Sequence, residues 1–511
     1  MPNDKIKNLD ELSIILKKLK DAGRKIIHCH GVFDLVHPGH IRHFQAAKAL
    51  GDVLVVTVTA DEYVNKGPGR PVFIQGLRAE SIAALGCVDY VAINFSFNAA
   101  ELIKKLSPDI YVKDKEYADA AKDETCGIFL ERGAVESVGG KISFTDEITF
   151  SSSSLLNEYF DIYSEPVQNF LKKFRERYTA EQVIEKVKNL NNLRALVIGE
   201  TILDEYAFMA PMLGKPPKGN HIAMRFLSEE VHAGGIIACA NHLANFCGKV
   251  DLVTAVGNDG KEEFVRSHLK PNINPKLFVH TEAPTITKRR FVDNAFFNKL
   301  FEIYIIDDKI SLRLEDMVKA YIGKIFLSEV YDLILVLDYG HGLLTPSLIR
   351  LICDQNHFLA VNAQTNTANM GFNPITKYPR ANYFCLDDRE LRMAFQDNYN
   401  DVKILVKSLA TKMSFLRGGI AVTLGHLGSI TYDVKTQEFY NAPILSQKIV
   451  DTTGAGDAFL ALTAPCVASG FPMDLVAFIG NVAGALAVGY LGNRSSIEAA
   501  PFFKFITALL K

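Results

Sequence analysis

The sequence predicts an α/β protein with parallel sheets and more than one domain. At 511 residues the chain is too long for a single hydrophobic core, so two or three domains are expected. Residues 25–30 and 53–59 form apolar segments around a helical pattern, and such a strand–helix–strand unit requires a parallel sheet. Near the other end of the chain, a glycine-rich loop at 451–457 precedes apolar residues that suit a helix, which predicts an anion-binding helix start.

The composition limits the classes of partner. With 48% hydrophobic and 22% charged residues the chain is typical of a soluble globular protein, and a net charge of −2 provides no broad basic field for nucleic acid or an anionic membrane. We therefore expect neither as a partner. The eight cysteines contain no C-x-x-C pair, and no apolar run approaches the roughly 18 to 20 residues of a membrane span. Both features predict reduced thiols in a cytoplasmic protein.

The first expected domain covers residues 1–160, and its central feature is the segment 31–40, Gly-Val-Phe-Asp-Leu-Val-His-Pro-Gly-His. Pro38 fits the first turn of a helix. Because His37 and His40 lie three residues apart at this helix start, their imidazoles can face one point above the strand ends. Two such groups suit the charge that builds up on a phosphate during transfer.

The full pattern G-x-F-D-x-x-H-x-G-H resembles the signature of the cytidylyltransferase-like nucleotidyltransferases. The loop 66–71 (K-G-x-x-R-P), the helix from Arg78 and the serine run at 151–154 are similar to further motifs of that family. The resemblance implies a Rossmann-like domain that uses CTP or ATP, with His37 and His40 as catalytic residues. The residues that it implies for nucleotide and phosphate binding are Gly31, Phe33, Asp34, Lys48, Lys66, Arg70, Arg78, Lys113, Ser151, Ser152 and Ser153.

Some of these residues keep a second interpretation. The alternative for Lys66 and Arg70 is that they are solvated loop charges, and the alternative for Lys48 is a solvated charge on the polar side of its helix. Asp114 follows Lys113 where the family has glycine, so the choice between CTP and ATP stays open. Residues 161–192 are rich in charge, and Glu165-Pro166 breaks the pattern near their start, which predicts a charged helical linker.

The second expected domain covers residues 193–511, and the loop before its predicted helix reads Asp451-Thr-Thr-Gly-Ala-Gly-Asp457. Successive backbone N–H groups in such a loop can hold an anion, and an acidic residue in the first helical turn can take a proton from an alcohol beside a phosphate. The plainer interpretation is a glycine-rich turn in which Asp457 caps the helix. The string D-T-T-G-A-G-D-A-F at 451–459 resembles the signature of the ribokinase-like (PfkB) sugar kinases.

That resemblance implies a ribokinase-like α/β domain with a small β lid, which binds ATP and has Asp457 as its catalytic base. The nucleotide- and phosphate-binding residues would be Thr423, Gly425, Gly428, Thr453, Gly454, Ala455 and Gly456. The substrate-binding residues would be Asp204, Gly234, Gly235, Asn241, Lys288 and Arg290. Asp387 and Glu390 are candidates to act on Mg²⁺ through water.

The combination resembles the bifunctional heptose kinase/nucleotidyltransferases with the order of the domains reversed. It predicts a transferase that phosphorylates a sugar and couples a sugar phosphate to a nucleotide, making an activated, heptose-like sugar for surface polysaccharide. We expect a homodimer or a larger assembly. The alternative is an active nucleotidyltransferase whose kinase-like domain only binds sugar or regulates. That alternative draws on departures from the kinase pattern at Glu200, His341, Asn362 and Asp387.

Overall fold

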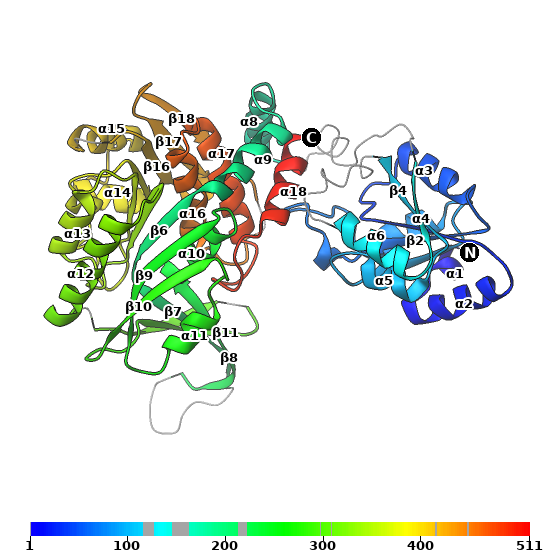
Figure 1. The fold of residues 1–511 in the computed structure, drawn as a ribbon, viewed down its shortest axis with the longest axis horizontal. Coiled ribbons are helices and arrows are strands. Elements are labelled where there is room, and N and C mark those ends of the chain that lie inside the picture. The colour runs from blue at the N-terminus through cyan, green and yellow to red at the C-terminus, as the bar shows by residue number, and fades with distance from the viewer. Residues whose placement is uncertain are drawn as a thin grey trace. The chain divides into compact units, whose positions relative to one another are not determined.

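The computed structural model describes residues 2–115, 127–145, 163–212, 222–296, 298–307, 309–413, 416–446 and 449–511 (Figure 1). The chain divides into two compact units, residues 1–181 with 500–511, and residues 182–499. The segment expected as a linker is thus shared between the units. Its first helix, α8 (Glu165–Arg175), lies in the first unit with the C-terminal helix α18 (Ala499–Leu510), because Arg175 donates two hydrogen bonds to the carbonyl of Leu509, at 2.6 and 3.2 Å.

The first unit is built on a parallel five-stranded sheet with the order β3-β2-β1-β4-β5, which confirms the predicted parallel sheet. Residues of alternate parity on β1 face opposite sides, so Ile27 joins the core under α3 and α4 while Ile26 joins the core under α2, α5 and α6. The strands are β1 (Ile26–Gly31), β2 (Val53–Thr59), β3 (Tyr90–Asn94), β4 (Ile110–Asp114) and β5 (Lys141–Thr145). The other helices are α1 (Pro2–Lys5), α2 (Leu9–Asp21), α3 (Pro38–Lys48), α4 (Gln75–Ala83), α5 (Ala100–Leu106) and α6 (Gly127–Ser137).

The second unit has a nine-stranded sheet with the order β10-β9-β6-β13-β14-β15-β16-β17-β18. The strands from β10 to β16 run parallel, and the last two are antiparallel. These strands are β6 (Arg194–Gly199), β9 (Lys249–Gly257), β10 (Ile273–His280), β13 (Leu333–Asp338), β14 (Leu359–Ala363), β15 (Tyr383–Asp387), β16 (Gly419–Thr423), β17 (Ser429–Asp433) and β18 (Glu438–Ala442).

Helices cover both faces of this sheet (Figure 1). A large core lies under α12 to α15 on one face, and α10, α16 and α17 pack together on the other. The helices are α9 (Ala180–Lys188), α10 (Ile236–Ala244), α11 (Glu262–Ser267), α12 (Leu312–Ser328), α13 (Pro346–Cys353), α14 (Asp388–Phe395), α15 (Val402–Lys412), α16 (Ala455–Ala468) and α17 (Met473–Ala487). Within the described ranges, none of the helices combines the length and the apolar character that crossing a membrane requires.

A separate four-stranded sheet with the order β12-β11-β7-β8 is the predicted β lid. It starts directly after β6, because only Glu200 separates that strand from β7. Its strands are β7 (Thr201–Pro211), β8 (Met224–Gly235), β11 (Thr287–Asp293) and β12 (Lys299–Ile305). The lid therefore carries its side chains to the carboxyl ends of the parallel strands, where α/β proteins bind ligands.

Candidate active sites

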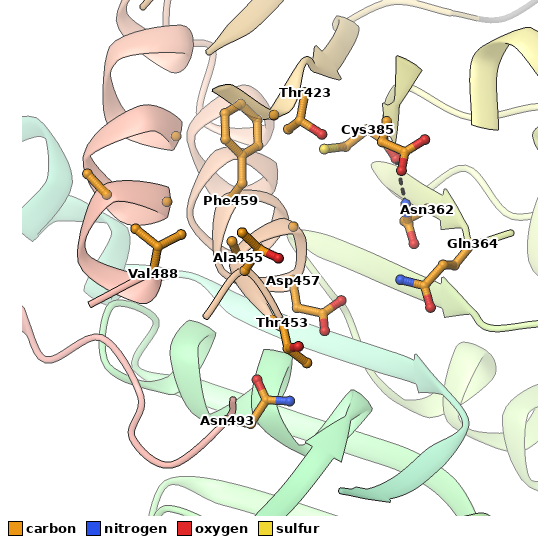
Figure 2. Close-up of a pocket in the computed structure, with 18 of the residues that line it drawn as sticks. Asn362, Gln364, Cys385, Thr423, Thr453, Ala455, Asp457, Phe459, Val488 and Asn493 are labelled. Carbon is orange, nitrogen blue, oxygen red and sulfur yellow. Dashed lines mark hydrogen bonds between the residues drawn. The ribbon is translucent and has the colours of Figure 1, made fainter. Parts of the chain in front are cut away.

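A cavity of about 580 Å³ in the second unit is lined by the start of α16, the ends of β14 to β16 and residues of the lid (Figure 2). It gathers most of the residues that the sequence assigns to a kinase site. Those that line it are Asp204, Gly235, Lys288, Arg290, Asp387, Glu390, Thr423, Gly425, Gly428, Thr453, Gly454, Ala455, Gly456 and Asp457. One space thus contains the glycine loop, the acidic residue that follows it and the lid charges.

Asp457 lies in the first turn of α16 and points into this cavity (Figure 2). The N-cap of the helix is Gly454, which has φ 83° and no side chain to cap with, so the interpretation of Asp457 as the helix cap is wrong. A Cβ on Gly454 would lie 2.2 Å from Oδ1 of Asn493, so both φ and space require glycine. Burial raises the pKa of Asp457 to about 7, although the hydroxyl of Tyr339 donates to Oδ1 at 3.0 Å and counteracts the rise.

At the lid end of the cavity, the Asp204 carboxylate is held by Arg290 Nη1 at 2.5 Å and by Asn493 Nδ2 at 3.0 Å. Arg290 also donates to Glu302 at 3.0 Å, so its guanidinium is occupied by carboxylates. Lys288 lies over the ring of Tyr304, and burial lowers its pKa. Among the described residues its ammonium makes no hydrogen bond or ion pair, so Lys288 is the better candidate of the two cations for an anionic group of a substrate.

Gly234 does not line the cavity, but its missing side chain lets Asp204 approach. A Cβ at this position would lie 2.0 Å from Oδ2 of Asp204. We expect Gly234→Ala to displace that carboxylate and, if Asp204 binds the phosphate-accepting substrate, to raise the KM for that substrate at least about tenfold, the effect of losing one bond to a charged group. Gly323→Ala on α12, where an added Cβ meets nothing within 4 Å, is the control and should leave the KM unchanged in steady-state assays. An unchanged KM in Gly234→Ala would contradict a substrate-binding role of Asp204.

Asn241 lies outside this cavity, contrary to its assignment as a substrate-binding residue. Its position on α10 directs the side chain to the loop after α11, where the amide donates to the carbonyl of His268 at 2.8 Å and accepts from the N–H of Lys270 at 3.0 Å. Both ends of the amide are therefore used to hold a loop, which is a structural role.

Asp387 and Glu390 form a capping box at the start of α14, so their predicted water-mediated contact with Mg²⁺ competes with a structural role. Asp387 Oδ1 accepts from the N–H of Glu390 at 2.6 Å, and the two oxygens of Glu390 accept from the N–H groups of Asp387 and Thr365. Asp387 and Glu390 also line the cavity. In the described part of the chain, no three acidic, histidine or cysteine side chains are grouped to hold a metal.

The opposite end of the cavity is bounded by the turn after β16 and by α17. Gly428 has φ 93°, and a Cβ there would lie 2.0 Å from the carbonyl oxygen of Ala442, so the turn depends on glycine. Asn362 donates to the carbonyl of Cys385 at 2.9 Å, and Gln364 extends from the same strand end toward Asp457 (Figure 2).

In the first unit, His37 is the N-cap of α3, and its ring stacks on that of His40 with centroids 3.9 Å apart. Phe33, at φ 51°, meets His40 edge-on at 5.1 Å, and a Cβ on Gly31 would lie 2.9 Å from the Phe33 ring. Burial, together with the smaller effects of the charges of His37 and Lys66, lowers the pKa of His40 to about 3. Both imidazoles are thus neutral near pH 7, and each offers one N–H donor.

Lys66 belongs to the same site, because its charge also lowers the pKa of His37. Burial and the neighbouring Arg70 lower the pKa of Lys66 itself to about 8. Lys113, at the end of β4, pairs with Glu131 at 3.1 Å and lies over the ring of Tyr111. Ser151, Ser152 and Ser153 lie outside the described residues.

Three predicted nucleotide ligands instead fix the loops around the site. Asp34 is fully buried and accepts from the N–H groups of Val72 and Phe73 at 2.8 and 3.1 Å and from Arg70 at 3.3 Å. The side chain of Arg78 is also fully buried and donates to the carbonyls of Val32, Phe73 and Thr59 and to Asp61. Arg78 and the Asp34–Arg70 pair therefore act on the loops rather than directly on a nucleotide.

The sequence predicted that Lys48 binds the nucleotide, but the structure places it in the last turn of α3, away from the imidazoles at the start of the helix. Its ammonium contacts Asp89 and the carbonyl of Asp52, next to the residues where β3 and β2 begin, whereas the imidazoles lie at the other end of the helix.

We expect Lys48→Ala to leave nucleotide affinity within about twofold of wild type and to cost under about 1 kcal/mol of stability. Isothermal titration calorimetry of Lys48→Ala with CTP and with ATP tests this, and Lys66→Ala is titrated in the same way for comparison. A tenfold loss of affinity in Lys48→Ala would restore the original assignment.

Comparison with known proteins finds a different family in each of two separate stretches of the chain. Residues 28–186 match the family described as cytidylyltransferase-like, and residues 347–500 match the pfkB family of carbohydrate kinases. The chain carries a cytidylyltransferase-like domain followed by a pfkB-family kinase domain.

Two curated relatives are named "Bifunctional protein HldE". The chain is 34% identical over 182 residues to the protein of Trichlorobacter lovleyi, a match covering 35% of this chain and 33% of the relative. It is 36% identical over 167 residues to that of Geobacter metallireducens, covering 32% of each. The matches thus span about a third of the length of these relatives. The phosphofructokinase-2 of Escherichia coli in complex with potassium covers 62% of this chain and all of its own, with a TM-score of 0.50 and 14% identity, which shows the kinase fold alone.

The kinase cavity contains residues that the motifs did not indicate. Tyr339, Gln364 and Asn493 all line it. Tyr339 stands in the Asp338-Tyr-Gly-His-Gly turn, so its position after a buried strand was a usable signal. Asn493 lies in the segment after α17, in no recognised motif, and only the fold brings it to Asp204.

Proposed function

We propose that the chain is a bifunctional transferase that phosphorylates a sugar and couples a sugar phosphate to a nucleotide, yielding an activated, heptose-like sugar for surface polysaccharide. The observation that carries the kinase half is the partly buried Asp457 carboxylate, which points into a cavity between the glycine loop and the lid charges. The two family matches support the enzyme class, and the named relatives support the pairing of two activities in one protein.

In the kinase step, Asp457 takes the proton of the sugar hydroxyl as its oxygen attacks the γ-phosphorus of ATP. The bond from that phosphorus to the bridging oxygen breaks, and ADP leaves. The backbone N–H groups of Gly454, Ala455 and Gly456 hold the charge that grows on the transferred group. Asp387 at the cavity would hold Mg²⁺ through water, and the ion bound with ATP would supply neutralisation of the phosphate charge.

In the transferase step, a sugar phosphate oxygen attacks the α-phosphorus of CTP or ATP, and the bond to the β-phosphate breaks to release pyrophosphate. His37 and His40 donate N–H groups to the phosphate oxygens, and Lys66 supplies positive charge beside them. Gly31 and Phe33 place the imidazoles, while Asp34, Arg70 and Arg78 hold the surrounding loops.

We further propose that the enzyme works in the cytoplasm as a homodimer or larger assembly.

A second candidate keeps the transferase active and makes the kinase domain a sugar-binding or regulatory module. Asn362, which stands where kinases of this type have an acid, favours it. Glu200 does not, because its carboxylate accepts from the N–H groups of Tyr339 and His341 and so supports the site.

The test is a substrate panel: ADP release from ATP and Mg²⁺ with neutral sugars and sugar phosphates, followed by pyrophosphate release from CTP or ATP with the matching sugar 1-phosphates. The proposal expects ADP release that depends on one sugar, and pyrophosphate release with one nucleotide. Pyrophosphate release without any sugar-dependent ADP release would favour the second candidate.

A further inference from the structure

The turn that follows β13, residues 338–342, is held by hydrogen bonds from several elements. Glu200 accepts from the N–H groups of Tyr339 at 3.0 Å and His341 at 3.3 Å. The amides of Asn366 and Asn369 donate to the carbonyl of Tyr339 at 2.7 and 2.8 Å. Both the N–H and the carbonyl of residue 339 therefore have fixed partners, and the direction of its side chain is set by the fold.

The Asp338 carboxylate also stabilises the start of this turn. It accepts from the hydroxyl of Tyr378 at 2.6 Å, from Asn373 at 3.1 Å and from the N–H of Gly340 at 3.0 Å, and it pairs with Lys377. Gly340 has φ 73°, and a Cβ there would lie 2.3 Å from Asn369, so the turn closes only around glycine.

The side chain of Tyr339 ends at the proposed catalytic base. The residue is 2% exposed, it lines the cavity, and its hydroxyl lies 3.0 Å from Oδ1 of Asp457. A phenol donating to Oδ1 occupies that oxygen and leaves Oδ2 as the atom that can face a substrate hydroxyl. The donor also favours the ionised carboxylate, the form that a general base requires.

We propose that Tyr339 is a positioning residue for Asp457, with Glu200 holding the backbone that aims it. This inference rests on the proposed kinase function. It also gives the glutamate at position 200, where kinases of this type have aspartate, a role at the site.

Other charged or titratable groups surround Asp457 and must stay unchanged in any test of its ionisation. They come from the lid, from α10, from β15 and from α14: Asp204, Lys288, Cys239, Cys385 and Glu390. A substitution at Tyr339 removes only the hydroxyl and leaves all of these in place.

The first test is the pH dependence of kcat in Tyr339→Phe. Because a general base works ionised, activity falls as the pH drops through the pKa of Asp457. Removing the donor raises that pKa, so the acidic limb should move to higher pH by about one unit. The matched control is Tyr331→Phe, which removes another buried hydroxyl, one that hydrogen-bonds to Asp251 outside the cavity. An unmoved limb in Tyr339→Phe, or an equal shift in Tyr331→Phe, would overturn the proposal.

A second measurement needs no turnover. Carbon-13 NMR of protein labelled at aspartate carboxyls, with the resonance assigned through its loss in Asp457→Asn, follows the titration directly. We expect a higher midpoint in Tyr339→Phe than in wild type and in Tyr331→Phe, and an equal midpoint would contradict the inference. If the midpoint moves but no sugar supports ADP release, the coupling of Tyr339 to Asp457 stands and the kinase proposal fails.

Discussion

Replacing Asp457 by asparagine is expected to lower sugar-dependent ADP release by about 10²- to 10⁴-fold, the contribution of a general base. Asparagine has nearly the same shape, and its carbonyl can still accept from Tyr339, so the cavity should keep its geometry. What is lost is the group that takes the proton of the sugar hydroxyl. Initial-rate assays of ADP release, with sugar near saturation, measure the effect.

Asp474→Asn is the matched control, because Asp474 is a buried aspartate in the first turn of the neighbouring helix α17 and does not line the cavity. It should change thermal stability without changing kcat by more than about twofold. If both variants lose activity equally, the loss reflects folding, and the role of Asp457 as base is contradicted.

The second large effect is expected at the imidazoles of the first unit. His37→Ala and His40→Ala should each lower pyrophosphate release by about 10²- to 10³-fold, the magnitude seen when one donor to a developing negative charge is removed. The two rings stack at 3.9 Å, so loss of one also frees the other to reorient. Because burial and nearby charges lower the pKa of both imidazoles, we expect no loss of transfer when the pH rises from 6 to 7, which is below the pKa of about 8 of Lys66.

Lys48→Ala lies on the same helix and provides the control for the histidine variants, since it changes the far end of α3 only. Pyrophosphate release should stay near the wild-type rate in this variant. Full activity in either histidine variant would show that the imidazoles are not part of the transfer machinery.

The sequence was most informative where a function is written in consecutive residues. The loop at 451–457 predicted a phosphate cradle and Asp457 beside it, because the chemistry depends on backbone N–H groups of one short segment. The segment 31–40 predicted a strand, a turn and a helix start for the same reason. The parallel sheets followed from the strand–helix–strand pattern.

The assignments of single charges were less successful, because a charge in a motif does not reveal what surrounds it. Arg78 donates to backbone carbonyls, and Lys48 lies at the start of two strands instead of their ends. Asn493 reaches Asp204 only through the folding of residues 289 positions apart. Glu200 suggested a weakened kinase, but in the structure its longer side chain accepts from two N–H groups of the turn that carries Tyr339.

The central claim is that one chain contains two independent transferase sites. It is tested most directly by measuring ADP release and pyrophosphate release side by side for wild type, Asp457→Asn and His40→Ala. The account predicts that Asp457→Asn loses only ADP release and that His40→Ala loses only pyrophosphate release. Loss of both activities in either variant, or no sugar-dependent ADP release in wild type, would contradict it.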